Sequence, residues 1–190
     1  LQSKISRYKS DLKKRKKEYG FIRDGSGKRY LLFWLLFVLN DIEKSEEYFK
    51  WYKEEFSDDI GEPIQKLCWA LSLHRMGKED EAKYRLADAM LSNLYIIPIV
   101  IGLDVKTYDM WHSSNMSEIE YAEEVPEEII DAINESDIKW MEELYHSSSF
   151  RSIRERYIEI FNRIRFTDNL EDRRELLDEA RSLLDEFAKE

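Results

Sequence analysis

The pattern of Leu39-Asn40-Asp41-Ile42-Glu43-Lys44-Ser45 returns 37 residues later as Met76-Gly77-Lys78-Glu79-Asp80-Glu81-Ala82. Each segment ends an apolar run, passes through a turn and enters a charged run. The same offset places Phe49 over Leu86. Repetition at this spacing indicates one helical hairpin written twice between Tyr30 and Leu91.

The residues around both turns favour helices. The segment 30–39 is apolar on nearly every side, which predicts a helix buried over most of its circumference. Pro63 suits the first turn of the next helix, where its missing N–H costs nothing. Gly77 stands where a left-handed residue ends a helix. Segments at about 42–56 and 78–92 then return as the second helices of the two hairpins.

The two hairpins resemble tetratricopeptide repeats over about residues 29–94. That family places small or large apolar residues in its first helix, a glycine at the turn, and an alanine and a larger residue in its second helix. In the second hairpin the matching residues are Ala70, Leu73, Gly77, Ala82, Leu86 and Ala89. In the first hairpin, which fits more loosely, they are Phe33, Leu36, Asn40, Ser45, Phe49 and Tyr52. The resemblance implies a short right-handed α-α superhelix.

The resemblance also implies a concave groove lined by the first helices. The side chains expected to face it are Tyr30, Trp34, Phe37, Leu67, Leu71, His74 and Arg75. Such an aromatic groove suits a hydrophobic helix or an extended peptide. It predicts a non-enzymatic interaction module or adaptor that binds a protein segment or its own copy.

A second interpretation of the same groove is that the chain fills it itself. Two hairpins are short for a stable solenoid, and terminal repeats need a cover. The loop around Trp111 or the C-terminal helical hairpin could lie over Trp34 and Phe37. Both interpretations remain open at the level of sequence.

Length and composition fit an all-α chain that forms one compact unit. Its 190 residues are 43% hydrophobic and 37% charged, a balance typical of amphipathic helices with a large solvated surface. We expect a basic N-terminal helix (1–19), the hairpins (20–104), an irregular connection (105–125) and C-terminal helices packed on the repeats (126–190).

Charge is distributed unevenly along the chain. Residues 1–30 hold eleven Lys/Arg and three acidic residues, a net charge of +8. Because the whole chain has a net charge of −10, residues 31–190 carry −18. An acidic body disfavours nucleic acid and anionic membranes as partners. The basic run from Lys13 to Lys17 nevertheless keeps nucleic-acid contact open as an alternative function, although a solvated helix end explains it more simply.

Cysteine content and hydropathy predict a cytoplasmic protein. Cys68 is the only cysteine, which excludes an internal disulfide and a multi-cysteine zinc site. The longest apolar run, 30–39, is too short to span a bilayer, and no signal-peptide pattern opens the sequence.

Catalytic and cofactor motifs are weak. Gly25-Ser26-Gly27-Lys28 lacks the first glycine and the following Ser/Thr of a phosphate-binding loop. The string 111–115 is the most unusual, and Trp111, His112, Ser113 and Asn115 form a candidate small-ligand or hydrolytic site, with packing as the simpler interpretation. We therefore predict no enzyme activity, no cofactor and no metal site.

Overall fold

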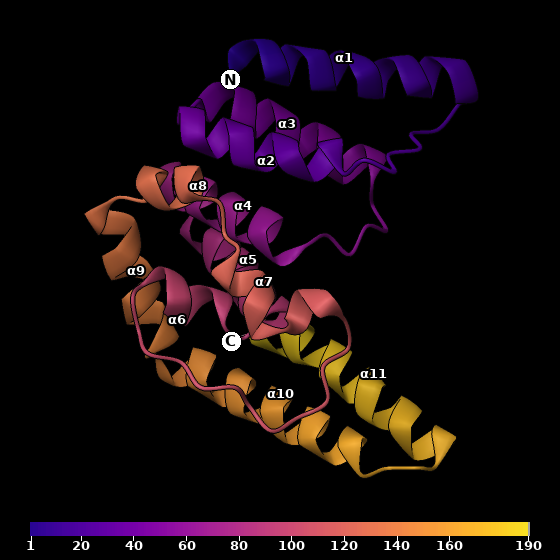
Figure 1. The fold of residues 1–190 in the computed structure, drawn as a ribbon, viewed down its shortest axis with the longest axis vertical. Coiled ribbons are helices and arrows are strands. Elements are labelled where there is room, and N and C mark those ends of the chain that lie inside the picture. The colour runs from indigo at the N-terminus through magenta and orange to yellow at the C-terminus, as the bar shows by residue number, and fades with distance from the viewer. Residues whose placement is uncertain (190) are drawn as a thin grey trace.

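The computed structural model describes residues 1–189, and all regular structure in that range is helical (Figure 1). The helices are α1 (Gln2–Tyr19), α2 (Lys28–Leu39), α3 (Ile42–Glu55), α4 (Pro63–Arg75), α5 (Glu79–Ser92), α6 (Ile96–Val100), α7 (Ile119–Glu123), α8 (Glu127–Ala132), α9 (Glu135–Tyr145), α10 (Ser148–Arg165) and α11 (Leu170–Phe187), with one 3-10 turn, η1 (Asn115–Ser117). The prediction of an all-α chain is confirmed.

The helices form an elongated stack with α1 at one end and the α10–α11 hairpin at the other (Figure 1). Helix α2 lies against α1, α3, α4 and α8, while α5 lies against α4, α6, α10 and α11. This packing does not clearly form a superhelix of repeats. None of the helices in residues 1–189 is both long and apolar enough to cross a membrane.

Both predicted hairpin turns are present. Asn40 has φ 50° and Gly77 has φ 71°, so each adopts the left-handed conformation that ends a helix. The Asp41 side chain then accepts a hydrogen bond from the Lys44 N–H at the start of α3. The predicted connection at 105–125 contains η1 and α7, and it is otherwise without regular structure.

An aromatic cluster around Phe33 joins the two hairpins. The Phe33 ring lies 5.2 Å from the ring of Tyr48, 5.1 Å from Phe49 and 4.9 Å from Tyr52, measured between centroids. It also lies 5.0 Å from Trp69 of α4. Because Phe33 of α2 is fully buried among rings from α3 and α4, it holds the three helices together.

A buried ion pair joins α4 to α5. The ammonium group of Lys66, a residue only 6% exposed, lies 2.6 Å from Asp88 Oδ1 and donates to Ser92 Oγ at 2.7 Å. These two acceptors satisfy the buried charge, so the polar group is compatible with the core.

Replacing Phe33 by alanine is expected to destabilise the protein by about 3–5 kcal/mol, because the change opens a cavity among four rings. Urea unfolding followed by circular dichroism measures the difference. Phe166→Ala is the matched control, since Phe166 is 72% exposed, and it is expected to change stability by less than about 0.5 kcal/mol. Equal losses for both variants would show that the cluster does not organise the core.

Glu62 makes stability depend on pH. Burial raises the pKa of its carboxyl group, Arg29 opposes this and Asp59 adds to it. Because the folded state favours the protonated form, the stability contributed by Glu62 is present below about pH 4 and is lost as pH rises through the raised pKa. Glu62→Gln should therefore be more stable than the parent at neutral pH and equal to it in acid. Urea unfolding at both pH values tests this, with exposed Glu155→Gln as the control.

Candidate functional site

The seven residues predicted to line a groove do not form an open surface. Phe37, Leu67 and Leu71 are fully buried, and Tyr30, Trp34, His74 and Arg75 are half-buried. Helix α8 packs against α2 and covers this side of the first hairpin. Of the two interpretations of the groove, the burial of these residues fits the second, in which the chain itself occupies the face that the first helices present.

Arg75 fixes the cover in place. Its Nη2 lies 2.5 Å from Asp137 Oδ2 at the start of α9 and donates to the carbonyl oxygen of Ala132 in α8 at 2.6 Å. Its Nη1 donates to Asn40 Oδ1 at 3.1 Å, and the guanidinium lies 4.4 Å from the centre of the Phe37 ring. One side chain thus joins α2, the first turn, α8 and α9.

His74 contributes a second contact between α4 and α9. Its imidazole stacks on the indole of Trp140, with 4.3 Å between ring centroids. The carboxylate of Glu79 bridges the two, since one oxygen lies 2.9 Å from His74 Nδ1 and the other accepts from Trp140 Nε1 at 3.1 Å. The predicted groove residue is therefore engaged by the cover.

The other two half-buried residues face different neighbours. Trp34 faces α1, and Lys4 Nζ lies 5.5 Å from the centre of its ring. The Tyr30 hydroxyl donates to Asp59 Oδ1 at 2.6 Å, and it also accepts from Arg29 Nη2 at the same distance. The cover consists of α8 and α9, with α1 on another side of α2. Both helices lie in the segment 126–190 that is expected from the sequence to pack on the repeats, although the sequence indicated the Trp111 loop and the C-terminal hairpin as the parts that could lie over Trp34 and Phe37.

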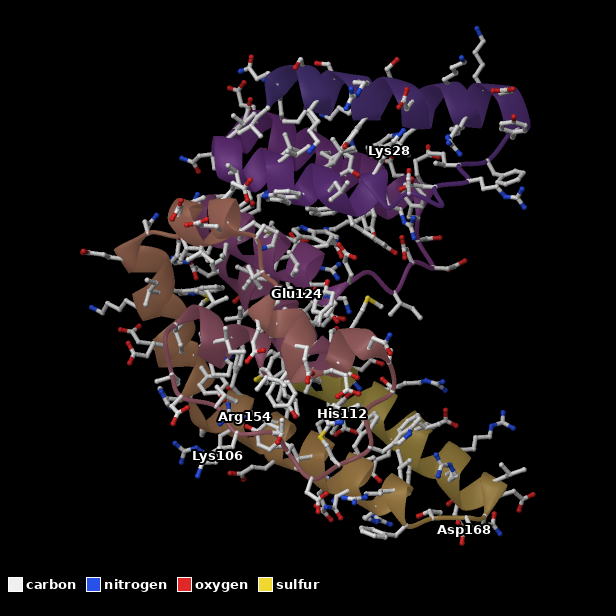
Figure 2. The ribbon with its side chains drawn as sticks, viewed as in Figure 1. Lys28, Lys106, His112, Glu124, Arg154 and Asp168 are labelled. Atoms are coloured by element: carbon white, nitrogen blue, oxygen red, sulfur yellow. The ribbon has the colours of Figure 1, made fainter. Side chains whose placement is uncertain are left out.

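The loop around Trp111 packs against the C-terminal hairpin. The Trp111 indole stacks on Phe161 of α10, with 5.9 Å between centroids, and its backbone N–H donates to the Phe161 carbonyl at 3.2 Å. The Arg173 guanidinium of α11 lies 5.4 Å from the indole centre. These contacts hold the segment along α10, where Figure 2 labels His112.

His112 is held by packing contacts and is not paired with a serine. Its Nε2 lies 3.0 Å from the hydroxyl of Tyr95, which is buried and also accepts from the Tyr108 N–H at 3.0 Å. Its Nδ1 lies 3.9 Å from a carboxylate oxygen of Glu118. Ser113 and Asn115 are exposed, and Asn115 begins η1. The four predicted loop residues thus do not converge on one reactive centre.

Other reactive groups in the described part of the chain are also engaged in structure. Cys68 is fully buried, and this burial raises the pKa of its thiol far above the ordinary value, so the thiol stays protonated. Within residues 1–189, no group of three or more His, Cys, Asp or Glu side chains is placed to hold a metal ion.

Helix α1 presents the most distinctive exposed surface. Its inner face is attached by the buried Ile5 and Leu12 and by an ion pair from Lys28 Nζ to Asp11 at 2.6 Å; Figure 2 shows Lys28 between α1 and α2. The opposite side, here called the α1 basic face, exposes Arg7, Lys13, Lys14 and Lys17. Within residues 1–189, none of these four cations has a carboxylate at ion-pair distance.

A pocket of about 130 Å³ lies between α1 and α3 beside the α1 basic face. It is lined by Lys9, Lys13, Glu47, Tyr48 and Trp51. Burial lowers the pKa of Lys9; Lys13 and Lys44 lower it further, whereas Glu47 and Asp41 raise it. The pocket therefore combines two lysines with the half-buried aromatic side chain of Trp51. Sequence reasoning recognised the basic run but missed this pocket, because its two walls lie on helices that are distant in sequence.

Comparison of the chain with protein-family models, with curated proteins and with solved structures finds no match in any of the three. The resemblance to tetratricopeptide repeats therefore rests on the residues of the two hairpins.

Arg75→Ala is expected to destabilise the protein by about 3 kcal/mol, because it leaves the buried carboxylate of Asp137 without its partner. It should also speed hydrogen exchange of the α8 amides more than that of the α10 amides, since α8 loses its attachment. Lys139→Ala is the control, because Lys139 is exposed in α9. Unchanged exchange in α8 would show that Arg75 does not secure the cover.

Proposed function

We propose that this chain is a non-enzymatic helical interaction module or adaptor that binds an acidic protein segment through the α1 basic face. In this proposal the α2–α3 and α4–α5 hairpins are a divergent tetratricopeptide-like pair in a short right-handed stack. The protein acts in the cytoplasm, where its single thiol stays reduced. The observation that carries the proposal is a group of four exposed cations that have no carboxylate at ion-pair distance within residues 1–189, in a chain whose residues 31–190 carry a charge of −18.

The position of the cover directs the partner to α1. Because α8 and α9 occupy the first-helix face, the aromatic residues predicted to bind a peptide are already in contact with the chain itself. The α1 basic face is exposed, and it is held on a helix that packs against α2 through Ile5 and Leu12. A rigid helix presents its charges in a fixed row, which favours an extended or helical acidic segment.

An acidic protein segment fits this surface better than a nucleic acid does. Residues 31–190 carry a charge of −18, so a long polyanion that extends past α1 toward the rest of the chain is repelled. A short acidic segment avoids this repulsion because it ends within the length of α1. The acidic surface of a second copy has the same chemistry, and the oligomeric state in solution distinguishes that arrangement.

A non-enzymatic role is supported by the environment of His112. Its two ring nitrogens face Tyr95 and Glu118, and its neighbour Trp111 is stacked on Phe161. A general base needs a free nitrogen directed at a substrate, and these contacts use the imidazole to attach the loop.

Reversing two charges of the α1 basic face should weaken binding of a labelled oligoglutamate peptide. Lys13→Glu/Lys14→Glu replaces two attractions by two repulsions, which predicts a loss of about tenfold at low salt and a shallower salt dependence. Fluorescence anisotropy across a salt series measures both. Lys106→Glu/Lys139→Glu is the matched control, because it makes the same change in net charge at exposed positions elsewhere. Equal losses in both variants would show that only net charge matters.

A further inference from the structure

We infer that the pocket between α1 and α3 binds the aromatic side chain of an acidic protein segment, with Lys9 and Lys13 pairing with carboxylates beside that ring. This inference rests on the proposed function and adds an anchor to it. The pocket opens next to the α1 basic face, because Lys13 belongs to both. A segment lying along α1 can therefore place one side chain between the two helices.

The size of the pocket suits one ring. Its volume of about 130 Å³ is close to the roughly 150 Å³ of a protein cavity that holds a benzene molecule. Its lining includes the half-buried Trp51, whose ring lies 5.5 Å from that of the buried Tyr48 at an interplanar angle of 32°. Rings prefer offset or edge contacts at such distances, so the Trp51 side chain offers an aromatic guest a matching surface.

The charge of the pocket selects the neighbours of that ring. Lys9 is half-buried, its Nζ lies 5.6 Å from the centre of the Tyr48 ring, and no carboxylate in residues 1–189 lies at ion-pair distance from it. Lys13 stands at the rim, also without an ion pair in this part of the chain. A carboxylate next to the guest ring would supply the charge partner that both ammonium groups lack.

Glu47 restricts the guest further. Its carboxylate lies in the same lining, so a guest that presents anionic groups on every side is disfavoured there. In a single-stranded nucleic acid every base is joined to a sugar that carries phosphates, whereas a peptide can place its aromatic ring on a residue separate from the acidic ones. The pocket therefore favours an acidic peptide over a single-stranded nucleic acid.

Phenylacetate is the probe for the pocket itself. We expect it to shift the indole N–H signal of Trp51 in a two-dimensional NMR spectrum, with the signal assigned by loss in Trp51→Phe. Acetate lacks the ring and benzylamine carries the opposite charge, so both should leave the signal in place. Lys9→Gln should weaken the phenylacetate response at least fivefold, while Lys106→Gln, at an exposed position elsewhere, should not. An equal response to benzylamine would overturn the inference.

A peptide pair tests the link to the proposed function. A short labelled peptide of glutamates around one phenylalanine should bind about tenfold more tightly than its alanine counterpart, and Lys9→Gln should reduce that ratio toward one. Equal binding of the two peptides overturns the pocket inference and leaves the α1 basic face intact. A phenylacetate response without binding of either peptide overturns the proposed function and restricts the pocket to free aromatic acids. If an oligothymidylate shifted the Trp51 indole signal and bound more tightly than the phenylalanine peptide, the choice of a protein partner would be overturned.

Discussion

The packing of Phe33 among the rings of Tyr48, Phe49, Tyr52 and Trp69 is the contact on which the other layers of this structure depend. It places α2 against α3 and α4, which bury part of the apolar surface of α2. Because α2 is apolar on nearly every side, the rest of its circumference must also be covered. Helix α1 covers one part and α8 another.

Covering α2 determines which surfaces remain for a partner. The cover is secured by Arg75, whose guanidinium reaches Asp137, Ala132 and Asn40 from the end of α4. Removing only Arg75 or only Asp137 would leave an unpaired buried charge and destabilise the fold, so α8 and α9 are firmly attached to the hairpins. The surface left exposed is then the outer side of the covering helices. On α1 that outer side is a row of cations.

Local features of the sequence predicted much of the fold. The turns at Asn40 and Gly77 are predictable from sequence because asparagine and glycine are the residues that most readily adopt the left-handed conformation at a helix end. The need for a cover followed from the apolar segment 30–39. The identity of the cover did not, because the pairing of Arg75 with Asp137 joins residues 62 positions apart and leaves no local pattern. For the same reason Lys13 was visible as part of a basic run, while the pocket it shares with Trp51 was not.

In the proposed complex, the charge distribution makes one aromatic side chain in the pocket contribute more to selective binding than additional exposed ion pairs along α1 would. At an ionic strength of 0.1 M, charges farther apart than about 10 Å are largely screened, so the four cations of the α1 basic face attract only groups that lie close to them. Beyond that range a ligand meets the −18 of the body. Ion pairs at an exposed surface contribute about 0.2–1 kcal/mol each, which gives little discrimination among acidic sequences. In the inferred complex, one ring placed in the pocket beside Trp51 would contribute more than any single pair, because it removes apolar area from water. Under the proposed function, selectivity therefore comes from the ring, and the α1 basic face orients the segment that carries it.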